Sequence, residues 1–267
     1  MEFRILGSLE AEAQGECVPL GGLCTEKVLA TLLLDAGRVV PVPRLVDALW
    51  DEDPPATAAK QARNAASRLR RLLAACGAPD AIVTHGAGYR LAVPDDGLDA
   101  RLFEARVSQA EAAASAGQLA GAAQALRTAL GLWRGPALDG IPGRTIGTAA
   151  SVWNERRYAV LETYCDHQLA LGRHREILGE LAALTADHPL REKPAGQLML
   201  ALYRCGRQAD ALTLYARTRK LLAEEMGLDP GPELQRLHQQ ILTADPALAM
   251  PDPGIASRAE LSDGTRT

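Results

Sequence analysis

The spacing of hydrophobic residues changes its period along the N-terminal part of the chain. Up to about residue 20, hydrophobic and polar residues alternate: Phe3 and Ile5 fall on one side, and Glu2 and Arg4 fall on the other. Glycines interrupt this alternation at several points. A period of two with turn residues between the runs predicts two or three short antiparallel strands within residues 2–20.

A helical period replaces the alternation from Thr25 onward. Val28 and Leu32 recur at the spacing of one helix face, Thr25 can cap the N-terminus, and Gly37 follows the C-terminal end. We expect a short helix over residues 43–50 and a third helix over residues 57–75. A hairpin then follows, with strands at 82–84 and 89–93 and a glycine-containing turn at 85–88.

Beyond a polar linker at residues 94–97, the pattern is helical as far as residue 243 and contains no convincing strand. Short breakers with Gly or Pro separate the expected helices, which cover residues 99–116, 119–133, 148–171, 173–187, 190–205, 207–226 and 231–243. The alternation of helices and tight turns resembles stacked hairpins of the tetratricopeptide type, with irregular spacing. We expect the tail from residue 246, rich in Pro, Asp, Ser, Gly and Ala, to be disordered.

Composition narrows the class of protein. Hydrophobic residues make up 47% of the chain and charged residues 23%, which is typical of a globular protein. Apolar runs such as residues 28–34 are far shorter than a membrane span, and the N-terminus lacks the basic and apolar regions of a signal peptide. The five cysteines are scattered and form no CxxC pair, so we expect no disulfide framework, no structural zinc site and a location in the cytoplasm.

The distribution of charge is more informative than its total. A net charge of −4 argues against nucleic-acid binding only when charge is counted over the whole chain. Residues 57–76 contain five basic side chains and no acidic one, while acidic residues gather just before them at positions 51–53. This cationic stretch coincides with the third expected helix.

That helix combines a small apolar face with a polar one. Ala62, Ala66, Leu69 and Leu73 share the side that faces the core. The opposite arc contains Lys60, Arg63, Asn64, Ser67, Arg68, Arg70 and Arg71. An Arg-rich arc can be a merely solvated surface, but here a short helix precedes it and a hairpin follows it at the spacing of a wing. This combination favours a helix in the major groove of DNA, where guanidinium groups pair with guanine and other cations contact phosphates.

Several sequence segments resemble known regulators. The hairpin sequence GAGYRL at residues 86–91 is similar to the end of the winged helix-turn-helix of OmpR-type response regulators. Segments that resemble the Streptomyces antibiotic regulatory protein (SARP) family are VPLGG at 18–22, RLVDALW at 44–50, PPAT at 54–57 and SRLRRLL at 67–73. Segments that resemble the bacterial transcriptional activator domain of that family are LWRGPAL at 132–138, HPLRE at 188–192, QLMLALYRCGRQADAL at 197–212 and EMGLDPGPEL at 225–234.

The resemblance covers residues 2–243 and implies a mainly α-helical fold, an α+β winged helix-turn-helix followed by an all-α, tetratricopeptide-like domain. We expect the DNA-binding domain at residues 1–94, the bacterial transcriptional activator domain at 98–245 and a disordered tail at 246–267. The sequence has no GxxxxGK[S/T] loop, so it looks like a small stand-alone member without the ATPase module of long members. We also expect it to have no phosphoacceptor receiver domain of the kind that OmpR-type regulators contain.

The resemblance also implies a transcriptional activator of secondary-metabolite (antibiotic) biosynthesis. Members of the family bind direct repeats near the −35 element and recruit RNA polymerase through sigma factor region 4 and the alpha C-terminal domain. We therefore expect promoter DNA and RNA polymerase as partners, with a homodimer or tandem protomers on the DNA. The N-terminal strands and the loop at residues 37–44 are the expected contact with the sigma factor.

Alignment with OmpR-type domains implies roles for individual side chains. Those expected at base edges are Arg63, Asn64 and Arg68, and those expected mainly at phosphates are Lys60, Ser67, Arg70 and Arg71. On the wing, His85 stands where relatives often have an arginine that enters the minor groove, and a neutral histidine is a weaker ligand there. Thr84, beside it, can bind phosphate.

A function of another class is a helical-repeat adaptor whose winged domain binds protein instead of DNA. The acid-free arc from Lys60 to Arg71 argues against the adaptor, because binding a protein does not require such an arc. The chain has no nucleophile motif and no HExxH sequence, so we expect no catalytic residue and no cofactor. We expect no metal at His167 and His174, because a helix break falls between them.

Overall fold

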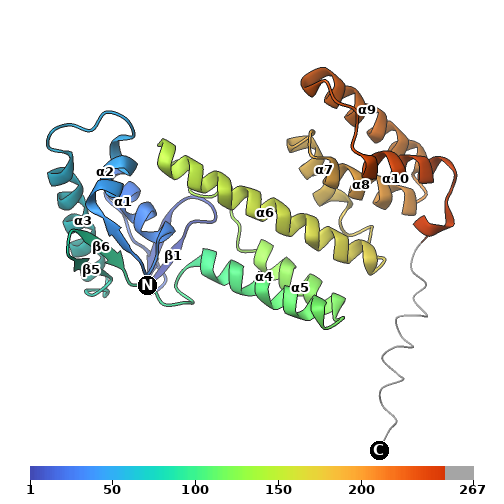
Figure 1. Ribbon diagram of the computed structural model, residues 1–267. Helices are drawn as coiled ribbons and strands as arrows, with labels where there is room; N and C mark the ends of the chain where they lie inside the picture. The colour runs from blue at the N-terminus through green and yellow to red at the C-terminus, as the bar shows by residue number, and fades with distance from the viewer. Residues whose placement is uncertain (250–267) are drawn as a thin grey trace, which may run out of the picture. The chain divides into compact units, whose positions relative to one another are not determined.

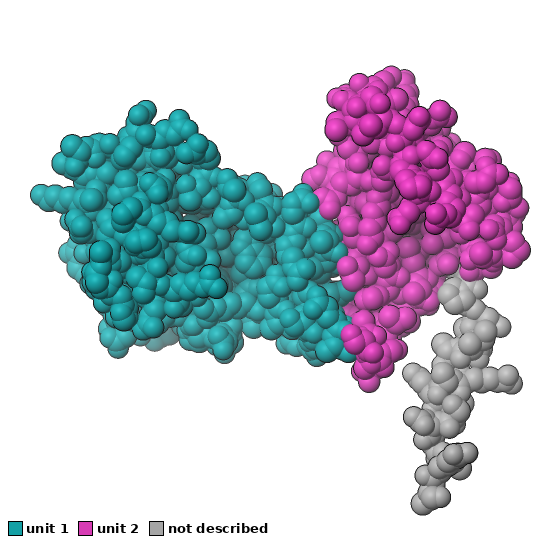
Figure 2. All heavy atoms as spheres, in the orientation of Figure 1, with its two compact units in different colours: residues 1–112, 124–160 teal, residues 113–123, 161–267 magenta. Residues whose placement is uncertain are grey.

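The computed structural model describes residues 1–249 and shows a mainly helical chain with two small sheets near its N-terminus (Figure 1). These residues form two compact units, the first of residues 1–112 and 124–160, and the second of residues 113–123 and 161 onward (Figure 2). The first helices of the expected second domain thus contribute to the same unit as the N-terminal sheets. The expected domain boundary near residues 94–98 remains a prediction.

The alternating segment at the N-terminus forms a three-stranded antiparallel sheet. β1 (Glu2–Arg4), β2 (Glu10–Ala13) and β3 (Glu16–Cys17) pair in the order β1-β2-β3, with Phe3 opposite Ala11. Both of these side chains are 1% exposed, because directly opposite residues of paired strands point to the same face of the sheet. The predicted short strands are confirmed.

Three helices follow: α1 (Leu23–Leu34), α2 (Val42–Trp50) and α3 (Ala58–Ala75). α1 begins before the predicted cap, and the prediction that Thr25 caps it is wrong. Thr25 is buried within the first turn, and its N–H donates to the carbonyl oxygen of Gly22 at 2.9 Å. Gly21 and Gly22 have φ values of 75° and 115°, which let the chain turn into the helix at an earlier residue.

The second sheet contains a strand that the sequence pattern did not predict. β4 (Val39–Pro41) pairs with β6 (Gly88–Leu91), which also pairs with β5 (Ile82–His85), giving the order β4-β6-β5. β4 lies in the segment expected to be a loop at residues 37–44. It is short, ends in proline and buries only Val40, so its alternation is too brief to detect. The hairpin β5–β6 itself is confirmed, with Gly86 and Ala87 as its turn.

The rest of the described chain is helical, as predicted. The helices are α4 (Asp99–Ser115), α5 (Leu119–Leu130), α6 (Arg144–Ala170), α7 (Leu178–Asp187), α8 (Glu192–Arg204), α9 (Gln208–Met226), α10 (Pro232–Leu242) and the 3-10 helix η1 (Pro246–Leu248). η1 lies in the segment expected to be a disordered tail, and its Leu248 is buried. The rest of the tail prediction, residues 250–267, lies outside the described residues. Within residues 1–249, no helix has both the length and the apolar character needed to cross a bilayer.

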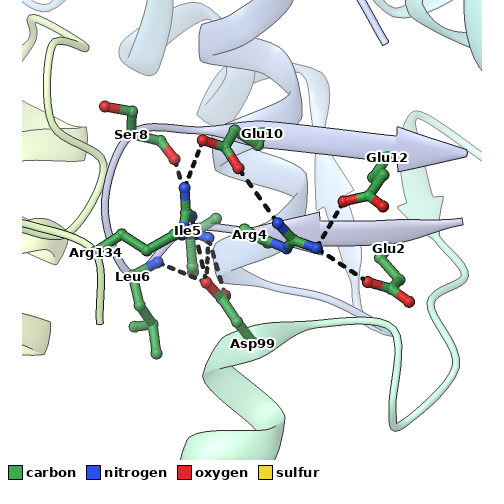
Figure 3. Close-up of polar contacts among 9 residues, drawn as sticks. All are labelled: Glu2, Arg4, Ile5, Leu6, Ser8, Glu10, Glu12, Asp99 and Arg134. Atoms are coloured by element: carbon green, nitrogen blue, oxygen red, sulfur yellow. Dashed lines mark hydrogen bonds and ion pairs between the residues drawn. The ribbon is translucent and has the colours of Figure 1, made fainter. Parts of the chain in front are cut away.

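A buried carboxylate fastens the N-terminal segment to the helical part of the same unit (Figure 3). Asp99, in the first turn of α4, accepts hydrogen bonds from the main-chain N–H groups of Ile5 (2.9 Å) and Leu6 (3.0 Å). Burial raises the pKa of Asp99, while these hydrogen bonds and the charge of Arg134 oppose the shift. The carboxylate therefore accepts hydrogen bonds from two main-chain N–H groups that lie just after the end of β1.

Arg134, from the LWRGPAL segment, completes the connection. Its guanidinium group forms ion pairs with Glu10 at 2.6 Å and Asp99 at 3.7 Å, and it donates to the carbonyl oxygen of Ser8 at 3.2 Å (Figure 3). The main-chain N–H of Arg134 also donates to the carbonyl oxygen of Leu6 at 2.8 Å. These bonds hold the N-terminal sheet and the LWRGPAL segment together, which gives that segment a structural role.

Candidate nucleic-acid interface

The apolar side of α3 is fully buried, as its spacing predicts. Ala62, Ala66, Leu69 and Leu73 are each 0% exposed, and the helix packs on both α1 and α2. Because α3 is held along this whole side, its opposite face is fixed relative to the winged core. The polar residues between the buried positions consequently point away from the core.

Six of the seven polar residues predicted for this face are exposed. They are Lys60, Arg63, Asn64, Ser67, Arg68 and Arg71. Among residues 1–249, no side-chain hydrogen bond or ion pair joins any of them to another residue. Four of the six are cations, so this face has positive charge that no acidic side chain among the described residues neutralises. Their N–H groups can donate hydrogen bonds to phosphate oxygens and to acceptors on base edges. We call these six residues the α3 polar face.

Arg70 differs from the rest of the predicted set. It is half-buried, and its guanidinium group binds the wing: Nε donates to the carbonyl oxygen of Ile82 at 3.0 Å, and Nη2 donates to Oγ1 of Thr84 at 2.6 Å. The same group lies 5.8 Å from the ring centroid of Tyr89. The prediction that Arg70 lies on the exposed arc is therefore wrong, and Thr84 is joined to it.

The wing is a tight hairpin that ends in exposed residues. His85 closes β5 and is exposed, as are Gly86 and Ala87 in the turn. Gly88 begins β6, and a Cβ atom there would lie 2.5 Å from the carbonyl oxygen of Val40 on β4. Only glycine permits this close approach of β4 and β6, which explains the glycine in the GAGYRL segment.

A loop of the N-terminal part contacts the α3 polar face. The guanidinium group of Arg68 lies beside Gly21, in the connection between β3 and α1. Sequence reasoning missed this contact. The glycine pair of the VPLGG segment was its only signal, because glycines commonly mark places where another group approaches the main chain closely.

The acidic residues that precede α3 are turned toward another part of the first unit. Asp51 accepts a hydrogen bond from the main-chain N–H of Arg144 at 2.8 Å, and Glu52 forms an ion pair with the Arg144 side chain at 2.8 Å. Arg144 is the first residue of α6, so Asp51 satisfies a main-chain donor at the start of that helix. Two of the three acids at positions 51–53 thus have a structural function.

The other candidate residues lie within the helical core. Trp133, Tyr164 and His174 are all buried. The residues described here contain no group of three His, Cys, Asp or Glu side chains placed to hold a metal ion. Arg156 forms a paired hydrogen bond with Glu104 at 3.0 and 2.8 Å, and the side chains of both residues are partly exposed.

Comparison with known proteins agrees with this arrangement. Residues 98–242 match the bacterial transcriptional activator domain, and residues 25–91 match the C-terminal domain of transcriptional regulatory proteins. The regulatory protein DnrI of Streptomyces peucetius is 37% identical over 270 residues, which cover 98% of this chain and 99% of DnrI. The regulatory protein AfsR of Streptomyces coelicolor is 46% identical over 250 residues, covering 93% of this chain.

A solved structure shows the same fold. The structure of Mycobacterium tuberculosis EmbR in complex with a low-affinity phosphopeptide has a TM-score of 0.86 and 34% identity, covering 98% of this chain and 69% of that chain. Against the AfsR proteins of Streptomyces coelicolor and Streptomyces griseus, this chain spans only 25% of the relative's length.

The fold, the wing and these matches define a transcriptional regulator with a winged helix-turn-helix DNA-binding domain, not an enzyme. Its DNA-binding domain is of the OmpR type and precedes a bacterial transcriptional activator domain. The chain belongs to the SARP family of regulators.

Proposed function

We propose that this chain activates transcription by binding double-stranded promoter DNA in a sequence-specific manner. α3 enters the major groove with its polar face toward the bases. In this proposal Arg63, Asn64 and Arg68 read base edges, and Lys60, Ser67 and Arg71 contact phosphates. The wing lies against the adjacent backbone, with His85 at the minor groove and Thr84 near a phosphate.

One observation supports this function above all others. The α3 polar face combines four cations and two uncharged polar side chains that have no partner within residues 1–249. A purely structural surface arginine commonly pairs with a nearby carboxylate, as Arg156 does with Glu104 in this chain. Two of the acids that precede α3 in the same unit, Asp51 and Glu52, instead bind Arg144. The positive face thus remains available to a polyanion.

The later steps of activation are proposed from the family. Two protomers bind direct repeats near the −35 element and recruit RNA polymerase through sigma factor region 4 and the alpha C-terminal domain. The genes controlled are those of secondary-metabolite biosynthesis, and the protein acts in the cytoplasm. The segment at residues 37–44 is a candidate sigma contact, because β4 is an edge strand and its Val39 is 47% exposed.

Selection from a random duplex library tests this function without knowledge of the promoter. The full chain should enrich a spaced direct repeat, and its affinity should fall steeply with salt because DNA binding releases counterions. Arg68→Ala should lose about 1–3 kcal/mol of binding free energy on the enriched duplex. Arg127→Ala, which removes an exposed arginine of α5, is the matched control and should bind as the wild type does.

Two results would count against the proposal. Enrichment of no sequence, with only weak and salt-sensitive retention, would favour the adaptor that binds protein through its winged domain. Unchanged affinity in both Arg63→Ala and Arg68→Ala would show that α3 is not the recognition helix.

A further inference from the structure

Arg70 stands apart from the other arginines of α3 because its hydrogen bonds stay within the protein. Arg68 and Arg71 are exposed, whereas Arg70 is half-buried beneath the wing. Its Nε and Nη2 atoms donate to two different acceptors, the Ile82 carbonyl oxygen and the Thr84 hydroxyl. A cation held in this way is poorly placed to contact a phosphate at the same time.

Both acceptors of Arg70 belong to the outer strand of the wing. β5 lies at the edge of its sheet and pairs only with β6. Ile82 and Thr84 are separated by one residue along β5, and the strand ends at His85 beside the wing tip. Arg70 therefore holds the unpaired side of β5 against α3, close to the residues that are proposed to meet DNA.

The planar guanidinium group suits this task. Its N–H groups diverge in a fixed fork, so one side chain can bind a main-chain oxygen and a hydroxyl simultaneously. The ring of Tyr89, which pairs with Thr84 across the hairpin, lies within cation–π range of the same group. A lysine has the same charge but a single nitrogen, and it cannot reproduce this geometry.

We infer that Arg70 is a positioning residue, which sets the wing relative to the recognition helix by binding Ile82 and Thr84. Its contribution to DNA binding is to fix where His85 and the wing tip stand with respect to the α3 polar face. This role replaces the phosphate contact expected from the sequence. The inference rests on the proposed function for its effect on DNA, but the contact itself is a property of the free protein.

The first test uses the full chain without DNA. Amide hydrogen exchange of β5 and β6 is measured in Arg70→Lys, which retains the charge, and in Thr84→Val, which removes the hydroxyl acceptor. In both variants these amide hydrogens should exchange about tenfold faster, because the loss of one hydrogen bond to a charged group destabilises the closed wing by about that factor. Arg71→Lys, the same change at the exposed neighbour, should leave the exchange unchanged. Equal exchange in all four proteins would overturn the inference.

The second test measures affinity for the duplex that the wild-type protein enriches. Arg70→Lys and Thr84→Val should each weaken binding about tenfold. The double variant should be no weaker than Arg70→Lys alone, because Arg70→Lys already removes the hydrogen bond to Thr84. The salt dependence of Arg70→Lys should equal that of the wild type. Full affinity in Arg70→Lys would show that the guanidinium group does not set the wing for DNA binding. Additive losses in the double variant would identify Arg70 and Thr84 as separate DNA contacts. Either result would overturn the inference.

The two tests separate failure of this inference from failure of the proposed function. If the wild-type chain binds no DNA while the hydrogen exchange of the wing still depends on Arg70, the proposed function fails and the contact stands, without an effect on DNA. If the wild type binds DNA and the exchange of Arg70→Lys is unchanged, the positioning role fails and the proposed function stands.

Discussion

The guanidinium group of Arg68 on α3 lies beside the main chain of Gly21 in the loop that precedes α1. A Cβ atom at Gly21 would be 3.1 Å from Nη2 of Arg68 and 3.6 Å from its Cζ and Nε atoms. Gly21 also has a φ of +75°, a conformation that other residues rarely adopt. The absence of a side chain at Gly21 therefore leaves room for the guanidinium group of Arg68, the arginine that is proposed to read a base.

Gly21→Ala should weaken DNA binding by displacing Arg68. The new methyl group would require the guanidinium group to shift by a few tenths of an ångström, so we expect a loss of affinity smaller than that of Arg68→Ala and a relaxed preference at the base that Arg68 contacts. Gly15→Ala is the control, because Gly15 has a similar φ of +82° but no atom within 4 Å of an added Cβ. Both variants should lose about 1 kcal/mol or more of stability from backbone strain. Equal DNA binding by the two variants would contradict the predicted role of Gly21.

Arg68 and Arg71 should differ in how their removal affects DNA binding. Arg71→Ala is expected to weaken binding to all sequences alike and to reduce the slope of log affinity against log salt by about 0.9, because one phosphate contact is lost. Arg68→Ala is expected to reduce discrimination at one base pair. Binding isotherms on matched and mismatched duplexes at several salt concentrations measure both effects. Loss of sequence preference in Arg71→Ala would reverse the two assignments.

Local periodicity accounts for what the sequence predicted well. The spacing of Ala62, Ala66, Leu69 and Leu73 identified the buried side of α3, because a helix repeats every 3.6 residues wherever it lies. The alternation at Phe3 likewise predicted the first sheet. Such patterns depend on the residues of one element alone.

The errors came from contacts between elements. Arg70 falls at the border of the polar arc, and only the placement of β5 decides whether it faces solvent or the wing. β4 became a strand because β6 lies beside it, although Pro41 and its short length conceal the strand pattern. The roles of Gly21 and Asp99 likewise depend on groups far away in the sequence.

Asp99→Ala should destabilise the first unit. The change leaves the N–H groups of Ile5 and Leu6 buried without their acceptor, which costs about 1–3 kcal/mol for each unsatisfied group. Asp95→Asn is the control, because Asp95 is fully exposed and its 3.4 Å ion pair with Arg101 should contribute little. Denaturant unfolding of the full chain measures the difference. If both variants unfold at the wild-type midpoint, the Asp99 hydrogen bonds do not stabilise the native state.

The second unit should lose stability as the pH falls, through His174. Burial lowers the pKa of His174, and the positive charges of Arg204 and Arg175 lower it further, while a main-chain hydrogen bond with Gly172 opposes the shift. Its Nδ1 atom is buried and has no hydrogen-bond partner among residues 1–249. The unfolded chain takes up a proton on this histidine below the ordinary histidine pKa of about 6.5, whereas the folded chain does so only at a lower pH. The free energy of unfolding therefore decreases as the pH falls from about 6.5 toward the folded pKa.

His174→Gln should remove part of this pH dependence, because glutamine does not titrate. We expect the wild-type chain to lose more stability than His174→Gln between about pH 7.5 and pH 5.5. The extra loss can reach about 1.4 kcal/mol for each unit by which the pKa of His174 differs between the unfolded and folded chain. Denaturant unfolding, followed by hydrogen exchange of α7 and α8, measures the loss in this unit. His85→Gln changes an exposed histidine of the wing and should keep the wild-type dependence. Identical pH profiles for the wild type and His174→Gln would show that the protonation of His174 does not limit the stability of the unit.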